Sequence, residues 1–416
     1  MKKLIVTTIF LLSISYAFTQ QSEKNSASFN LGEGISFSFN EGKYEFDIFG
    51  FIRPSYIYSD EKIYTSEGSY SNVYRQFKSQ NSNLYFTGAA IDEKLSFTIQ
   101  MDYSSSDPLV EAFIGYHINE KTTLYFGQMQ VSHNNLEMVH NENDLRFTSR
   151  GLISQTYTES GEEFGLFLET SFGNSFLVEP TLAITSGDGK NSFGEDSRDS
   201  DKGGVKFGSR INILPFGDFS EGNRVSTVDL IHEEKPKAQI GVAYSKNIGA
   251  SNLVGDGHGD FVLYDSSGEE NYPDYSQLFF DLNLKYKGFS LLFEYADSYA
   301  SGLDDIYTDP NGFNILVPKQ ISEYLVLGDS QGIHFGYFTK SGYSIDFIYE
   351  QSNPEFNSNI DSILRESNNV GFGLSKYLSD NNIKLQASVF KTKLKNSFVM
   401  QDDEFMNASF VVTLVF

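Results

Sequence analysis

Residues 405–416 read FMNASFVVTLVF, and this stretch at the end of the chain decides the fold class. Every even-numbered position in it is apolar, whereas Asn407, Ser409 and Thr413 fall on the opposite side of an extended chain. This alternation predicts a strand with one apolar face and one mostly polar face. We expect the strand to close a membrane barrel, where its backbone pairs with the first strand and its apolar face meets lipid. The alternative is an edge strand of a soluble β-sandwich.

The composition of the 416-residue chain suits many short strands. It holds 38 Phe, 25 Tyr and 35 Gly but only 9 Pro, and its hydrophobic content is 39%. Beyond the N-terminus, no run approaches the roughly 20 apolar residues of a membrane-spanning helix. Aromatic residues make up 15% of the chain, which fits the aromatic rims of a barrel with a polar interior.

Charge and residue content exclude several classes of function. A net charge of −24 argues against nucleic-acid binding, which requires a basic surface. The chain has no Cys, which excludes disulfides, thiolate metal sites and Cys catalysis. A Ser nucleophile needs a positioned His, and a single lumen-facing His such as His117 does not make a catalytic site, so we expect neither an enzyme nor a cofactor.

Residues 1–20 have the features of a signal peptide. Lys2 and Lys3 precede an apolar segment at 4–14, and small residues at 15–17 offer a cleavage site. We therefore expect an exported protein in the outer membrane of a Gram-negative-type cell. Residues 21–42 are expected to form a periplasmic lead-in, and residues 43–416 the barrel.

About sixteen segments of strand length follow from residue 43 onward. The clearest is 95–103, LSFTIQMDY, in which apolar and polar residues alternate strictly. Very short connections, such as 92–94 and 341–342, mostly alternate with long polar ones, such as 58–82 and 132–161. The long link at 215–235 departs from this pattern. We predict an all-β fold, a transmembrane antiparallel β-barrel of about 16 strands with short periplasmic turns and long extracellular loops; a soluble propeller would need a repeated blade motif.

The polar segment 132–161 is expected to fold inward and form the pore constriction, because long loops in compact folds are usually functional. Within it, Arg146 and Arg150 are four residues apart. Three interpretations stay open: an ion-pair network that holds the loop to the wall, a transverse electric field, or a phosphate site. The expected acidic partners of the two arginines are Glu137, Glu142 and Asp144, and the expected bases of the wall beside them are Arg53, Lys206 and Arg210.

The alternation also predicts which charged side chains of the wall face the lumen. Acids outnumber bases by about two to one, and only charges at a constriction select strongly, because a wide pore screens the others within ~10 Å. The acids are Asp47, Asp102, Glu111, Glu163, Glu169, Glu179, Asp281, Glu294, Asp346 and Glu350, and the bases are Arg53, Lys206, Arg210, Lys285 and Lys384.

No metal site is predicted. His133 and His140 lie in a polar loop, where His is usually solvated. The acidic stretch at 196–203 lacks the bidentate Glu of a calcium loop, and the stretch at 256–260 also fits a polar loop tip.

Three regions resemble the phosphate-selective porin O and P family of outer-membrane channels. The first comprises GISF at 34–37 and GKYEFDIFGFIRP at 42–54, similar to the family's first strand. The second runs from LYFGQMQ at 124–130 into the loop with Arg146 and Arg150, and resembles the strand and loop that enter the pore. The third, GSRINILPFG at 208–217 followed by AQIGVAYS at 238–245, is similar to the family's arginine-bearing strand and its Pro-Phe turn.

The resemblance implies a sixteen-stranded porin, usually a homotrimer, that passes phosphate or other anions. From the residues alone, we expect a channel in outer-membrane lipid for passive diffusion of small hydrophilic solutes or ions. One alternative is a non-conducting barrel with a surface binding, adhesion or structural role. A barrel enzyme would be a third class, whose turnover would depend on a single His or Ser.

Overall fold

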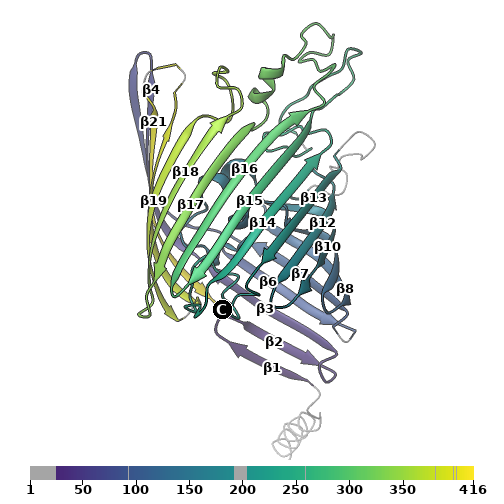
Figure 1. The fold of residues 1–416 in the computed structure, drawn as a ribbon, viewed down its shortest axis with the longest axis vertical. Coiled ribbons are helices and arrows are strands. Elements are labelled where there is room, and N and C mark those ends of the chain that lie inside the picture. The colour runs from purple at the N-terminus through teal and green to yellow at the C-terminus, as the bar shows by residue number, and fades with distance from the viewer. Residues whose placement is uncertain are drawn as a thin grey trace, which may run out of the picture.

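The computed structural model describes residues 25–91, 93–191, 204–257, 259–379, 381–396, 398–399 and 401–416. Within them the chain forms a closed antiparallel β-barrel with 16 wall strands, which confirms the predicted fold class (Figure 1). The predicted signal peptide lies outside the described residues. The first wall strand consists of β3 (Tyr44–Ile52) and its continuation β4 (Pro54–Thr65). The others are β6 (Asn83–Ala90), β7 (Leu95–Asp102), β8 (Leu109–Asn119), β9 (Thr122–Gln130), β10 (Glu162–Thr170), β12 (Leu177–Thr185), β13 (Lys206–Leu214), β14 (Lys237–Asn247), β15 (Asp274–Tyr286), β16 (Phe289–Ser301), β17 (Gly328–Phe338), β18 (Tyr343–Pro354), β19 (Ser367–Ser379), β20 (Ile383–Leu394) and β21 (Asp403–Val415).

The C-terminal strand closes the barrel. β21 pairs with β20 on one edge, and with β4 and the end of β3 on the other. Phe416 and Gly50 exchange two backbone hydrogen bonds, of 2.8 and 2.9 Å. Since a lipid-facing strand must satisfy its backbone groups within the protein, this pairing explains how β21 can lie in a membrane.

The wall is apolar outside and polar inside, the reverse of a soluble domain. Large apolar side chains on the outer surface are between 48% and 63% exposed, namely Ile114, Leu182, Ile211, Ile345 and Phe372. Polar and charged side chains of the wall strands are buried on the inner side, among them Gln128, Lys206, Asp281, Glu294 and Glu350. The period of two in the sequence therefore separates a lipid face from a lumen face.

The two ends of the barrel differ in their connections. At one end, here called the turn end, β15 and β16 are joined by Lys287 (φ 50°) and Gly288 (φ 88°), the two positive φ angles of a type I′ turn. The C-terminus lies at this end (Figure 1). Most long connections lie at the opposite, loop end. The wall is lower on one side, since β6 and β7 have 8 residues each whereas β15 and β16 have 13 each.

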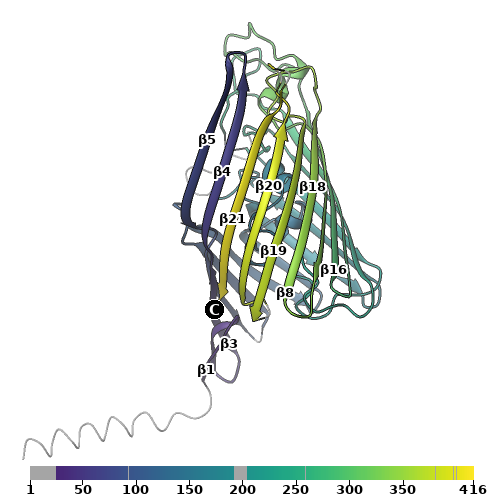
Figure 2. The same cartoon turned by 90° about the vertical axis from the view of Figure 1, so that its left-hand side faces the viewer.

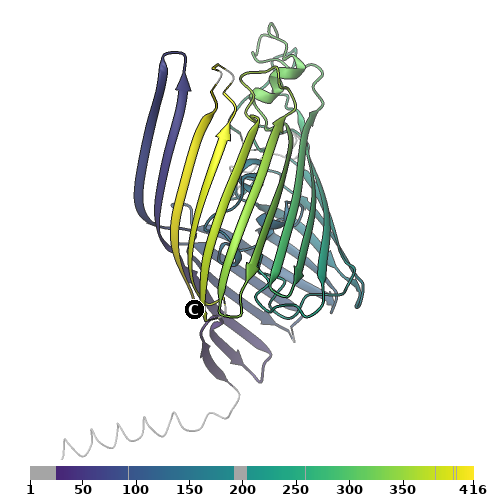
Figure 3. The same cartoon turned by 60° about the vertical axis from the view of Figure 1, so that its left-hand side comes forward.

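Among the described residues, four further strands lie outside the ring of wall strands. Figures 2 and 3 show that β4 and β5 (Gly68–Ser79) rise as a hairpin beside β21, where the sequence pattern predicted a polar loop over 58–82. At the turn end, β1 (Ser26–Asn30) and β2 (Gly34–Phe39) extend the sheet from β3, within the predicted lead-in. The short β11 (Phe172–Gly173) pairs with β12.

Helical structure is limited to short segments in the part of the chain that the structure describes. These are α2 (Leu136–Val139), η1 (Glu142–Asp144), α3 (Leu152–Tyr157) and η4 (Pro318–Glu323). Among the described residues, no helix combines the length and the apolar character needed to cross a membrane. Three of these segments, α2, η1 and α3, lie within residues 132–161, which enter the barrel and pack against its wall.

Candidate pore constriction

Residues 132–161, the inward loop, lie inside the barrel between β9 and β10. The loop is closed at its base, where the Val131 amide donates to the Gly161 carbonyl over 2.9 Å. Most of its apolar side chains are buried, with Phe147 and Ile153 both 0% exposed. Ile153 and Tyr157 pack on Phe279, while Phe147 packs on the wall residues Ile348 and Phe390. The loop is therefore fixed to one side of the lumen.

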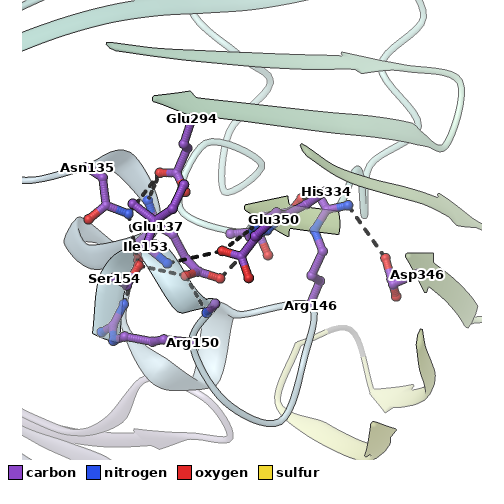
Figure 4. Close-up of polar contacts among 12 residues, drawn as sticks. Asn135, Glu137, Arg146, Arg150, Ile153, Ser154, Glu294, His334, Asp346 and Glu350 are labelled. Carbon is purple, nitrogen blue, oxygen red and sulfur yellow. Dashed lines mark hydrogen bonds and ion pairs between the residues drawn. The ribbon is translucent and has the colours of Figure 1, made fainter. Parts of the chain in front are cut away.

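Carboxylates from β16 and β18 hold the backbone of this loop (Figure 4). The Glu350 carboxylate accepts from the amides of Leu152 and Ile153, at 2.8 and 3.2 Å. Glu294 accepts from the amide of Glu137 at 2.8 Å and from the Asn135 side chain at 3.1 Å. Both carboxylates thus satisfy amides that α2 and α3 leave unpaired near their first turns.

Basic side chains of the wall hold the loop's carbonyl oxygens. Arg53 donates to Thr148 O over 3.0 Å, and Arg210 donates to Asn134 O over 2.9 Å. Lys384 on β20 donates to Leu145 O over 3.2 Å and also to the Asn143 carbonyl. Cations paired with backbone carbonyls at this depth of burial serve to position the loop.

Arg146 and Arg150 were predicted to act together, but their side chains point in different directions. Arg146 is 1% exposed and faces the wall, where it donates to Ser290 Oγ (3.2 Å) and lies 3.7 Å from Asp346 Oδ1. Arg150 instead faces the lumen and pairs with Glu142 over 2.7 Å. Burial opposes ionisation of Glu142, but the charges of Arg150 and Arg53 outweigh it and lower the pKa of the Glu142 carboxyl.

The remaining candidate residues are also engaged. The Glu137 carboxylate accepts from the Gly151 amide and Ser154 Oγ, both at 2.7 Å. The Asp144 carboxylate accepts from Asn381 Nδ2 over 2.5 Å. Lys206 pairs with Glu163 over 2.6 Å, with His133 Nε2 3.8 Å from the same carboxylate. Within the described ranges, no three His, Asp or Glu side chains form a metal site, and residues 196–203 and His258 lie outside those ranges.

A second segment also enters the lumen, from the turn end. Residues 215–235, the turn-end link, bury Asn223, Val228 and Asp229 completely. Lys285 on β15 donates to three carbonyls of the link, those of Asn223, Ser226 and Val228. The link touches the inward loop, since the Thr227 amide donates to Asp144 O over 3.1 Å.

Two adjoining cavities lie along the part of the wall that the inward loop and the link do not cover. The loop-end cavity, of about 520 Å³, is lined by β6–β10 and by the loop; the turn-end cavity, of about 470 Å³, is lined by β9–β14, the loop and the link. They adjoin, since Ser132, Val139, His140 and Glu169 line both. We call this pair of cavities the solute route. Of the candidate residues, Arg150 and Glu142 line its loop end and Arg210 its turn end.

Sequence reasoning missed two parts of this site. Glu162 lines the loop-end cavity, yet alternation within β10 placed only its neighbour Glu163 in the lumen; both are buried because they lie at the base of the inward loop. The turn-end link has no periodic pattern, so its place in the lumen could not be read from its residues. The one available signal was that this link is long, although it lies at the end of the barrel where the other connections are short.

Comparison with models of protein families finds no match, and comparison with curated proteins finds none either. Solved structures do match in fold. The outer-membrane channel DcaP of Acinetobacter baumannii has a TM-score of 0.55 at 12% identity, over 90% of this chain and 98% of that one. An anion-selective porin from Comamonas acidovorans scores 0.51 at 10% identity, over 90% and 100%. The outer-membrane protein OmpT of Vibrio cholerae, in its trimer form, scores 0.51 at 9% identity, over 90% and 99%.

This chain therefore has the fold of outer-membrane porins. Identities of 9–12% establish the fold alone. The porin fold is thus supported, whereas membership of the phosphate-selective family is not shown, and function has to be argued from the interior.

Proposed function

We propose that the protein is an outer-membrane channel for passive diffusion of small hydrophilic solutes or ions. The observation that carries this proposal is the solute route, whose two adjoining cavities extend from the loop end to the turn end. A polar route inside an apolar cylinder lets solutes cross lipid without losing contact with water and polar groups. The signal peptide predicted at 1–20 and the apolar outer surface support an outer-membrane location.

Planar-bilayer recording of the purified protein tests this proposal. We expect discrete, ohmic current steps in potassium chloride, and swelling of proteoliposomes in isosmotic glucose. Heat-modifiable migration on a gel would show that the sample is a folded barrel. A folded sample that produces neither steps nor swelling contradicts the channel.

One observation favours a second candidate, the non-conducting barrel. The inward loop and the turn-end link fill much of the lumen, and their side chains are fixed to the wall. In that case the long connections at the loop end would carry a binding or structural role. The bilayer recording separates the two candidates.

We also infer a homotrimer, because the structural neighbour OmpT was solved in a trimer form. The low wall at β6 and β7 and the exposed β5 hairpin, with Phe77 82% exposed, offer surface for a partner barrel. Chemical cross-linking in detergent is expected to give a band of threefold mass; a single protomer at all protein concentrations contradicts this assembly.

Phosphate passage, which the family resemblance implies, would require basic side chains free to meet the solute. Arg binds phosphate strongly through two parallel N–H donors of its guanidinium, and these donors must be free of other partners. Arg146 faces the wall and Arg150 is paired with Glu142, so neither supports such a site.

A further inference from the structure

We infer that the solute route selects small cations. This inference rests on the proposed channel and names its solute class. The charged groups that face the route are mainly carboxylates, whereas the basic side chains of the lumen hold the inward loop and the turn-end link.

The loop-end cavity is acidic. Its lining holds six carboxylates and two basic side chains, Arg150 and Lys190. Arg150 is neutralised by Glu142 at 2.7 Å and donates over 2.8 Å to the His140 carbonyl. The carboxylates are Asp102, Glu111, Glu142, Glu159, Glu162 and Glu169.

Two of these carboxylates hold key positions. Glu162 is only 9% exposed, and its carboxylate makes no hydrogen bond or ion pair with any residue that the structure describes. A buried carboxyl that faces a polar cavity without a protein partner is hydrated, binds a cation or takes up a proton, and each of these favours cations over anions beside it. Glu169 lines both cavities and is therefore placed where they adjoin.

The basic side chains predicted to face the lumen already bind partners within the protein. Arg53, Lys384 and Lys285 donate to main-chain carbonyls of the inward loop or the turn-end link. Lys206 is paired with Glu163, and Arg210 with Asp281, both over 2.6 Å. These five are the bases that alternation placed in the lumen, and each has a partner within the protein.

The turn-end cavity does not reverse this balance. Its bases are Lys121, Arg210 and Arg224, and Arg224 pairs with Glu179 through both of its terminal nitrogens. Lys121 lies at the rim and donates to Gly173 O over 3.3 Å. Fixed partners cancel most of the positive charge along this half of the route.

Size decides whether such charges act on a passing ion. A cavity of about 520 Å³ is ~10 Å across, which is comparable with the ~8 Å screening length of physiological salt. An ion in the cavity therefore feels most of its carboxylates, and acidic walls of low dielectric raise the local cation concentration.

Reversal potentials under a potassium chloride gradient test the inference. We expect potassium to permeate at least about three times better than chloride through the wild-type protein. The triple variant Glu111→Gln, Glu162→Gln, Glu169→Gln should bring the permeability ratio close to one, because it keeps side-chain size and removes three ionisable carboxyl groups. Glu269→Gln, on an exposed loop away from both cavities, is the matched control and should leave the ratio unchanged.

Proteoliposome swelling provides a second readout with organic solutes of equal ring size. Glucosamine should enter faster than glucose, and glucuronate more slowly. Chloride preference in the wild-type protein, or an unchanged ratio in a folded triple variant, would overturn cation selection while leaving the channel intact. The absence of any conductance would instead remove the proposed function itself.

Discussion

Replacing residues 132–160 by the dipeptide Asn-Gly is expected to raise single-channel conductance roughly threefold or more. The Val131 amide already donates to the Gly161 carbonyl over 2.9 Å, so a two-residue turn can join the two strands without moving them. The replacement removes the segment that separates the solute route from the rest of the lumen. Planar-bilayer recording measures the effect directly. The potassium preference should fall at the same time, because the wider water-filled lumen screens the remaining carboxylates.

The control shortens a loop that lies outside the lumen. Residues 309–313 form an exposed tip, where Phe313 is 84% exposed. Shortening this tip should leave conductance unchanged. Equal conductance for the wild-type protein and the Asn-Gly variant, with both folded, would show that the inward loop does not restrict the pore.

Asp281→Ala is expected to destabilise the barrel by about 3 kcal/mol, because it leaves a buried guanidinium without its counter-charge. Arg210 and Asp281 are 2% and 0% exposed and lie 2.6 Å apart. The pair lies over Gly241, where a Cβ would come within 2.1 Å of Arg210 Nη2. Urea unfolding in lipid vesicles, followed by far-ultraviolet circular dichroism because the chain has 0 Trp, measures the free energy.

A double variant separates the charge from the packing. Arg210→Met with Asp281→Leu removes both charges and should cost less than Asp281→Ala alone. Glu366→Ala, which removes an exposed partner of Lys395, should change the free energy of unfolding by less than about 0.5 kcal/mol. If the double variant loses as much as the single variants Arg210→Met and Asp281→Leu added together, the two side chains are not coupled.

The alternation of the wall strands predicted most of the fold. The segment expected at 95–103 matches β7 (Leu95–Asp102), since one of its faces is apolar and the other polar. The β4–β5 hairpin was missed, because both faces of β5 are exposed and its sequence has no one-sided pattern. One-sided burial is what makes a strand visible in a single sequence.

The interior was harder to predict, for a different physical reason. The inward loop could be placed by its length, but the partners of Arg146 and Arg150 depend on tertiary contacts. Residues 146–150 are not helical, so spacing of four residues does not bring the two side chains to one face. Charges in a lumen are paired by the closure of the ring, which brings β15, β18 and β20 opposite a loop far away in sequence.

The turn-end link and the inward loop also have a mechanical consequence. Lys285 donates hydrogen bonds to the link, and the Thr227 amide of the link donates to the Asp144 carbonyl of the loop. Lys384 donates to the next carbonyl of the loop, that of Leu145. This chain of contacts spans the cylinder from β15 to β20 as a brace. Lateral pressure from the bilayer, which would flatten an empty cylinder into an ellipse, is therefore resisted from within.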